Sequence, residues 1–258
     1  MSLDGLVAIV TGGSRGLGRE IVDALAARGA RVVACATAAW QADHANIECV
    51  VADVGDDEAC ARLVERTAKR HGRLDALINN AAIGMDSLRA PTPGFWNVSP
   101  QSWHRAFAVN VLGPFHMVRH AIPVMLPRRY GRIVNLTTSL TTMIKPDFTP
   151  YGPLKAALES ATAVWAGELD GSGITVNALL PGGPSRTRMI QDDPTFDLSA
   201  HRLLAPSIVV EPCLWLLSCE ADEVTGARID ASRWPCKPVN IRALIEGAQA
   251  SFQDLSRV

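Results

Sequence analysis

The chain has 258 residues, of which 48% are hydrophobic and 20% are charged, and its formal net charge is −1. These values are typical of a soluble globular protein with a large core, and they argue against disorder. No run of like charges offers a surface for nucleic acid or an anionic membrane. The first residues form no basic leader, so a cytoplasmic location is expected. Six cysteines without CxxC spacing indicate reduced thiols, neither a disulfide framework nor a metal site.

Short apolar runs alternate with longer amphipathic stretches along the chain. The apolar runs predict strands at 6–11, 31–36, 47–53, 74–82, 131–138, 173–181 and 227–230. The amphipathic stretches predict helices at 17–30, 57–72, 99–126, 150–170 and 207–220. Strands rich in Val, Ile and Leu that alternate with helices favour a parallel sheet covered on both faces, the doubly wound α/β class. Residues 1–234 are therefore expected to form one domain, and 235–258 a C-terminal extension with a helix at 239–255 outside the sheet.

A glycine-rich segment, TGGSRGLG at 11–18, follows the first predicted strand and opens the first predicted helix. In that position glycines let the backbone approach a pyrophosphate, which the helix N–H groups and dipole can bind. The spacing is TGxxxGxG, which differs from the GxGxxG of the commonest dinucleotide fingerprint. Taken alone, such a segment could equally be an ordinary turn.

A second motif, PYGPLKAALE at 150–159, begins the predicted helix 150–170. Tyr151 and Lys155 are four residues apart and therefore lie on one face of that helix. One interpretation is chemical, with a phenol and an ammonium acting together. The alternative is a tyrosine that packs against the core beside a solvated lysine.

The motifs together resemble the short-chain dehydrogenase/reductase family over about residues 6–226. The resemblance is carried by TGGSRGLG, ADV at 52–54, NNAA at 79–82, Asn110 in AVNVLGPF, and YGPLK at 151–155. It implies a Rossmann-like, mostly parallel seven-stranded sheet, an NAD(P)(H) cofactor and oxidoreduction of a carbonyl or alcohol. It also implies a homodimer or homotetramer that pairs through the helices 99–126 and 150–170.

The resemblance assigns catalytic roles to five positions. Tyr151 would donate a proton to the carbonyl oxygen, and Lys155 would lower the pKa of the phenol and hold the ribose hydroxyls. The family's serine, thirteen residues before the tyrosine, corresponds to Thr138, whose hydroxyl would bind the substrate oxygen, with Ser139 as the competing candidate. Asn110 would support a proton path to the lysine, or alternatively be a satisfied core amide.

The resemblance also predicts a set of cofactor contacts: Gly12, Ser14, Arg15, Gly16, Leu17, Gly18, Thr37, Asp53, Val54, Asn79, Ala81, Lys155, Pro181, Gly182 and Thr187. Asp53 could instead cap the helix at 57–72. Because Ala36 stands where an acid would repel a 2′-phosphate and Arg15 could bind that phosphate, NADP(H) is favoured over NAD(H). The alternative is an Arg15 side chain that simply points into water. The segment from Cys35 to Glu48 is too short for the usual helix, so an open adenine end is expected.

Three loops are expected to surround the substrate, at 84–98, 140–148 and 183–206. Their large apolar residues suggest a mostly apolar substrate of small to medium size: Phe95, Trp96, Met143, Ile144, Phe148, Met189 and Ile190. Four basic residues could meet a carboxylate or phosphate: Arg89, Lys145, Arg186 and Arg188. Two other classes remain open, a non-redox lyase or isomerase and a cofactor-sensing protein, although a sensor would not need the proton relay.

Overall fold

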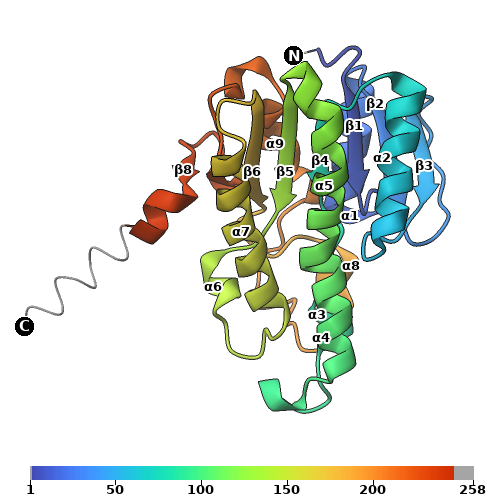
Figure 1. The fold of residues 1–258 in the computed structure, drawn as a ribbon. Helices are drawn as coiled ribbons and strands as arrows, with labels where there is room; N and C mark the ends of the chain where they lie inside the picture. Colours follow the sequence, from blue (N-terminus) through green and yellow to red (C-terminus); the bar gives the residue numbers. More distant parts are fainter. Residues whose placement is uncertain (1, 247–258) are drawn as a thin grey trace, which may run out of the picture.

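A single mixed sheet forms the centre of the protein (Figure 1). The computed structural model describes residues 2–246, and the strand order is β3-β2-β1-β4-β5-β6-β7-β8. All neighbours pair in parallel except β7 and β8, which are antiparallel. The strands are β1 (Val7–Thr11), β2 (Arg31–Ala36), β3 (Ile47–Val51), β4 (Ala76–Asn79), β5 (Gly131–Leu136), β6 (Ile174–Leu180), β7 (Ala227–Asp230) and β8 (Val239–Asn240). The predicted doubly wound α/β class is confirmed, with one strand more than expected.

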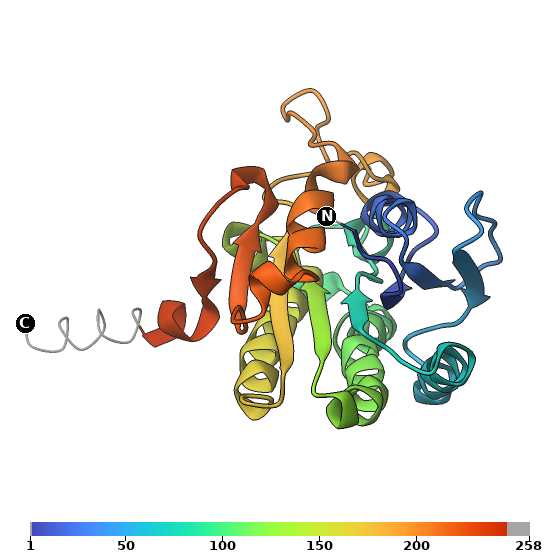
Figure 2. The same ribbon diagram turned by 90° about the horizontal axis from the view of Figure 1, so that it is seen from above.

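Helices cover both faces of the sheet (Figures 1 and 2). The α-helices are α1 (Gly16–Ala27), α2 (Asp57–His71), α3 (Met85–Leu88), α4 (Pro100–Phe107), α5 (Gly113–Met125), α6 (Leu140–Met143), α7 (Tyr151–Glu168), α8 (Arg188–Gln191) and α9 (Val210–Leu216). One core cluster joins the sheet to α1 and α9, and a second joins it to α2, α5 and α7. Short 3₁₀ turns lie at 95–97, 126–128, 206–209, 219–221 and 231–233.

Helix α2 shows how local sequence sets element boundaries. The Asp56 carboxylate accepts hydrogen bonds from the N–H groups of Glu58 and Ala59, and Gly72 ends the helix with a φ of 70°. The alternative interpretation of Asp53 as the cap of this helix is therefore wrong, because Asp56 has that role.

The connection between β2 and β3 contains no helix, as its length predicted. Arg19 of α1 holds this loop in place. Its guanidinium lies 5.3 Å from the centre of the Trp40 ring and donates a hydrogen bond to the carbonyl of Gln41 at 3.5 Å.

The predicted helix 99–126 is interrupted, whereas a continuous helix was expected. It consists of α4, a π-helical turn (Ala108–Leu112) and α5. In a regular α-helix the carbonyl of Asn110 would accept a bond from the N–H of residue 114, but Pro114 has none. The chain forms a wider turn at this point, with Asn110 inside it.

The first residues of the predicted C-terminal helix, 239–240, form a strand instead. Residues 239–240 form β8 beside β7, and the N–H of Ile241 donates to the carbonyl of Gly226 at 2.9 Å. The helix begins only at residue 241, and the rest of its predicted span lies beyond the described residues. Within residues 2–246, no helix is long and apolar enough to cross a membrane.

Candidate active site

The glycine-rich segment forms a turn between β1 and α1 that is held against the end of β4. The Thr11 hydroxyl accepts hydrogen bonds from the N–H groups of Asn80 and Ala81, both at 3.0 Å. The Asn80 amide in turn donates to the carbonyls of Thr11 and Gly12, at 2.9 and 3.0 Å. Asn80, the second asparagine of the NNAA motif, was not among the predicted site residues.

The turn has the shape that a dinucleotide phosphate requires. Gly12 has a φ of 65°, and a Cβ on it would lie 2.9 Å from the Cα of Ala81. A Cβ on Gly16, with a φ of 58°, would lie 3.2 Å from Cγ2 of Thr187, so the turn meets the segment after β6. Helix α1 begins without a side-chain cap at Arg15, which leaves its first N–H groups to an anion. These features fit the phosphate groups of a dinucleotide cofactor.

Tyr151 and Lys155 lie on successive turns at the start of α7. The Lys155 ammonium is 5.9 Å from the centre of the Tyr151 ring and donates to the carbonyl of Leu136 at 2.7 Å. Burial lowers the pKa of Lys155 to about 8, and burial, aided by Asp86, raises the pKa of the Tyr151 phenol to about 12. In the protein alone burial dominates the pKa of the phenol, and the lowering of that pKa by Lys155 with cofactor bound remains a prediction.

Thr138 and Ser139 follow the end of β5 and use their hydroxyls differently. Ser139 caps α6, where its hydroxyl accepts from the N–H of Thr142 at 3.1 Å. The Thr138 hydroxyl makes no hydrogen bond within the described chain, whereas its carbonyl accepts one from Arg228 at 3.0 Å. Of the two hydroxyls, that of Thr138 is the one not already used as a cap.

Asn110 is buried and bonds to one backbone position. Its side-chain oxygen accepts from the N–H of Ile83 at 2.8 Å, and its side-chain nitrogen donates to the carbonyl of Ile83 at 3.0 Å. Both ends of the amide are thus satisfied, as the core-amide interpretation requires. The amide holds the loop that follows β4, and the proton path remains a prediction.

Asn79 and Asp53 make contacts within the protein. The Asn79 amide donates to the Asn135 side chain on β5 at 2.8 Å, so it points into the core. Burial tends to raise the pKa of Asp53, but the hydrogen bonds from Arg105, at 2.8 Å, and from the N–H of Gly55, at 2.9 Å, hold that pKa below its ordinary value.

The remaining predicted cofactor residues lie around the turn with different exposure. Gly18 and Val54 are buried, Arg15 and Thr37 are exposed, and Ser14, Leu17, Ala81, Pro181 and Thr187 are half-buried. Gly182 has a φ of 84°, and a Cβ on it would collide with Asp230 and Ser232. The structure therefore requires glycine at this position for packing, independently of any cofactor.

Arg89 is not free to bind a substrate anion, which corrects one prediction. Its guanidinium makes a two-point ion pair with Asp193, at 2.8 and 2.9 Å, and also donates to the carbonyl of Asp147 at 3.3 Å. Arg89 thereby links all three loops that were expected to surround the substrate. On the third loop, Met189 packs so closely on Gly84 that a Cβ there would collide with it.

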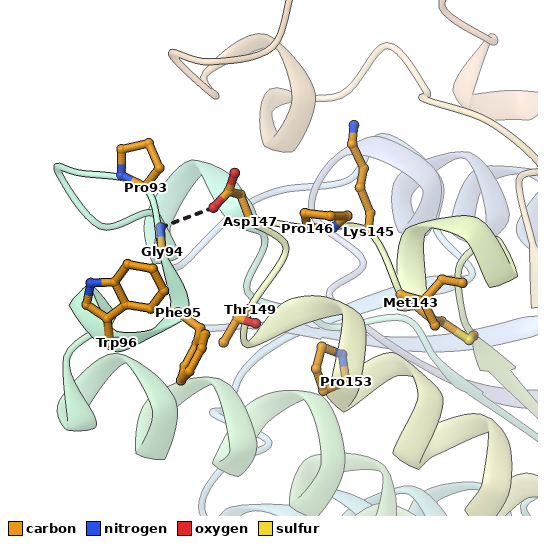
Figure 3. A pocket seen from close by; sticks show the side chains of 11 residues that line it. Pro93, Gly94, Phe95, Trp96, Met143, Lys145, Pro146, Asp147, Thr149 and Pro153 are labelled. Carbon is orange, nitrogen blue, oxygen red and sulfur yellow. Dashed lines mark hydrogen bonds between the residues drawn. The ribbon is translucent and has the colours of Figure 1, made fainter.

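Two of these loops form the walls of an open hollow of about 690 Å³ (Figure 3). Its apolar lining includes Phe95, Trp96, Met143, Ile144 and Pro153. Phe95 and Trp96 are 68% and 73% exposed. Pro153 belongs to the first turn of α7, so the hollow borders the helix that carries Tyr151.

The other basic candidates differ in their surroundings. Lys145 lies over the Phe148 ring, with 4.6 Å between its ammonium and the ring centre. Arg188 forms an ion pair with Asp192, with 3.6 Å between Nε and Oδ2. Arg186 lines a second hollow of about 620 Å³ together with Arg202 and other residues of the 198–206 segment.

The fold is that of a known class of oxidoreductase. Residues 6–196 match the family model described as short chain dehydrogenase, and the chain belongs to the short-chain dehydrogenase/reductase family of NAD(P)(H)-dependent enzymes. Over 238 residues it is 30% identical to the 3-oxoacyl-(acyl-carrier-protein) reductase FabG of Escherichia coli K12, covering 88% of this chain and 95% of the relative. The FabG of Thermotoga maritima is 30% identical over 241 residues, with coverage of 88% and 96%.

A solved structure agrees with this assignment. The 3-ketoacyl-(acyl-carrier-protein) reductase of Brucella melitensis, complexed with NADH, is similar with a TM-score of 0.78 and 28% identity. The similarity covers 89% of this chain and 97% of that one.

Proposed function

We propose that the chain reduces a carbonyl compound with NADPH, using Tyr151 as the general acid. The observation that carries this proposal is the pairing, at the start of α7, of a partly buried Tyr151 with a buried Lys155. A phenol with a pKa of about 12 keeps its proton at neutral pH and is therefore ready to donate it to a carbonyl oxygen. The bound cofactor would supply the hydride.

Two further side chains have roles in this proposal. Thr138 offers a hydroxyl, not used elsewhere, to hydrogen-bond the carbonyl oxygen as negative charge develops on it. Lys155 would hold the cofactor ribose, and its ammonium favours any phenolate that forms when the proton leaves. Asn110 fixes the loop after β4, which lies beside the glycine turn through Asn80.

The preference for NADP(H) rests on charge at the adenine end. Arg15 and Thr37 are exposed, and Ala36 ends β2 without a carboxylate. Arg15→Ala should weaken NADPH binding by about tenfold, because one charge-assisted contact to the 2′-phosphate is lost. NADH lacks this phosphate, so its binding should be nearly unchanged. Titration with NADPH and with NADH measures the two affinities. The control is Arg31→Ala, because Arg31 is also exposed but lies at the start of β2. Equal weakening of both cofactors would contradict the preference.

The apolar hollow beside α7 supports a proposal for the substrate class. Its lining favours an apolar chain attached to the carbonyl group, and the 3-oxoacyl thioesters named for the FabG relatives are the first class to examine. A panel of 3-oxoacyl thioesters, ketones, aldehydes and quinones, followed by NADPH absorbance, tests the proposal. Reduction of none of them would favour a non-redox role.

A further inference from the structure

The inner face of α7 carries polar residues where a sheet-packing helix normally carries apolar ones. Lys155, Glu159 and Thr162 follow one another at helical spacing and are 3%, 5% and 0% exposed. Lys155 donates to the last carbonyl of β5, and Thr162 accepts from an asparagine amide of β5 at 2.8 Å. Polar contacts therefore fix the position of the helix that begins at Tyr151.

Glu159 forms a buried ion pair with Arg228 of β7. The distance between Nε of Arg228 and Oε1 of Glu159 is 2.7 Å, and the two side chains are 12% and 6% exposed. Arg228 is in register with Ala178 of β6, which is in register with Asn135 of β5. Residues in one such row share a face of the sheet, so the Arg228 side chain lies on the α7 side.

The same guanidinium also holds the backbone at Thr138. Its Nη2 donates to the Thr138 carbonyl at 3.0 Å. Thr138 lies beyond Leu136, where β5 ends and the strand ladder no longer supplies a donor. The guanidinium is planar and rigid, so its bond to Glu159 and its bond to the Thr138 carbonyl have a fixed geometry relative to each other. The two bonds together therefore hold α7 and residue 138 at a fixed separation.

We propose that Glu159 and Arg228 are positioning residues that hold the Thr138 hydroxyl in place relative to Tyr151. The inference rests on the proposed function, in which Thr138 binds the carbonyl oxygen and Tyr151 protonates it. Arg228 acts through the Thr138 peptide, and Glu159 acts by orienting Arg228 and by anchoring α7. Well-packed apolar residues can often replace a buried ion pair without loss of stability, so stability alone does not require charges here.

A double variant separates positioning from stability. In Glu159→Leu/Arg228→Met the buried charges are replaced together, so the melting temperature should stay close to that of the wild type. Turnover of the carbonyl compound that the wild type reduces fastest should fall by about tenfold to a hundredfold, as expected for misplaced reacting groups. The KM and the dissociation constant of NADPH should change little. Arg228→Lys, which keeps the charge but not the fork, should give an intermediate turnover.

Hydrogen exchange gives a readout that does not depend on activity. Amides in the peptide spanning 136–143 should exchange faster in the double variant, and those in the β1 peptide should not. Faster exchange together with unchanged turnover would overturn the catalytic part of the proposal, and unchanged exchange would overturn all of it. If the wild type reduces no carbonyl compound, the proposed function fails, and the exchange result alone decides whether Arg228 positions Thr138.

A second arginine–carboxylate ion pair, at the opposite end of the sheet, provides the control. Arg73 bonds to Asp75 just before β4 begins, with Nε to Oδ2 at 2.6 Å. Arg73→Met should lower the melting temperature without changing turnover or exchange in 136–143. An equal loss of turnover in Arg73→Met would show that the double variant acts through general destabilisation, and would also overturn the proposal.

Discussion

The Tyr151 hydroxyl is the proposed proton donor, and it can be removed while keeping the ring, which packs against a small core cluster that includes Met85 and Leu154. Tyr151→Phe should lower kcat by about a hundredfold or more, the range expected for a positioned general acid. NADPH affinity, measured by titration, should stay within about twofold because the phenol is proposed to act in the chemical step. Retained turnover in this variant would remove Tyr151 from the mechanism.

The roles of the Thr138 and Ser139 hydroxyls can be distinguished by substitution. Thr138→Ser should keep activity, since it keeps the hydroxyl, and Thr138→Val should lose most of it. Ser139→Ala should leave kcat nearly unchanged but destabilise the protein by about 1 kcal/mol, because Ser139 caps α6. Steady-state kinetics and urea unfolding measure both effects. The opposite kinetic pattern would assign the role to Ser139.

Burial of Lys155 should make stability depend on pH. Its pKa falls from 10.5 to about 8 on folding, so the unfolded chain binds more protons between these values and stability should rise with pH across that window. The shift corresponds to about 3 kcal/mol. Tyr151 has the opposite effect, because its raised pKa should lower stability from pH 10 to about 12. Urea unfolding of Lys155→Met should lack the rise between pH 8 and 10.5, and a rise that persists would contradict the assignment.

At the scale of elements, β8 depends on one buried side chain. Ile241 is 3% exposed and follows the strand directly, so Ile241→Ala should destabilise the protein by roughly 2 to 5 kcal/mol. Ile245 is 51% exposed, and Ile245→Ala should change stability by less than about 0.5 kcal/mol. Thermal unfolding of both variants tests this, and similar effects would mean that β8 does not anchor the extension.

The elements that the sequence predicted are those with a clear period or motif. The central strands are continuous apolar runs, α1 and α2 carry apolar residues at helical spacing and end near a glycine, and α7 begins at the YGPLK motif. The π turn escaped prediction because its signal is a single missing N–H at Pro114. Strand β8 escaped because two residues are too few to show any period, and its pairing with β7 depends on tertiary packing.

The same distinction holds for the site. Tyr151, Lys155 and the glycine turn belong to contiguous motifs, so their neighbourhood could be predicted. Glu159 and Arg228 are 69 positions apart in the sequence and belong to no motif, so only the folded chain shows their contact. The pairing of Arg89 with Asp193 was hidden for the same reason.

At the scale of the whole molecule, the outer helices expose large apolar side chains that favour self-association. Phe107, Phe115 and Val164, on α4, α5 and α7, are 43%, 44% and 52% exposed. We expect a homodimer or homotetramer formed through these helices. Phe115→Glu should shift the mass measured by light scattering toward the monomer, whereas Val51→Glu, at an exposed position on β3, should not. A monomeric wild type would contradict the expectation.

The two edges of the sheet are protected against aggregation in different ways. On β3, Glu48 pairs with Arg66 and with Arg70, the latter at 2.7 Å, so an incoming strand would meet charges. The β7 edge is shielded by only the two residues of β8. If β8 detaches on heating, β7 becomes a template for strand pairing between molecules. The Ile241→Ala variant should therefore aggregate, as measured by light scattering, at a temperature below that at which its helical circular dichroism is lost. This aggregation would make its thermal denaturation irreversible.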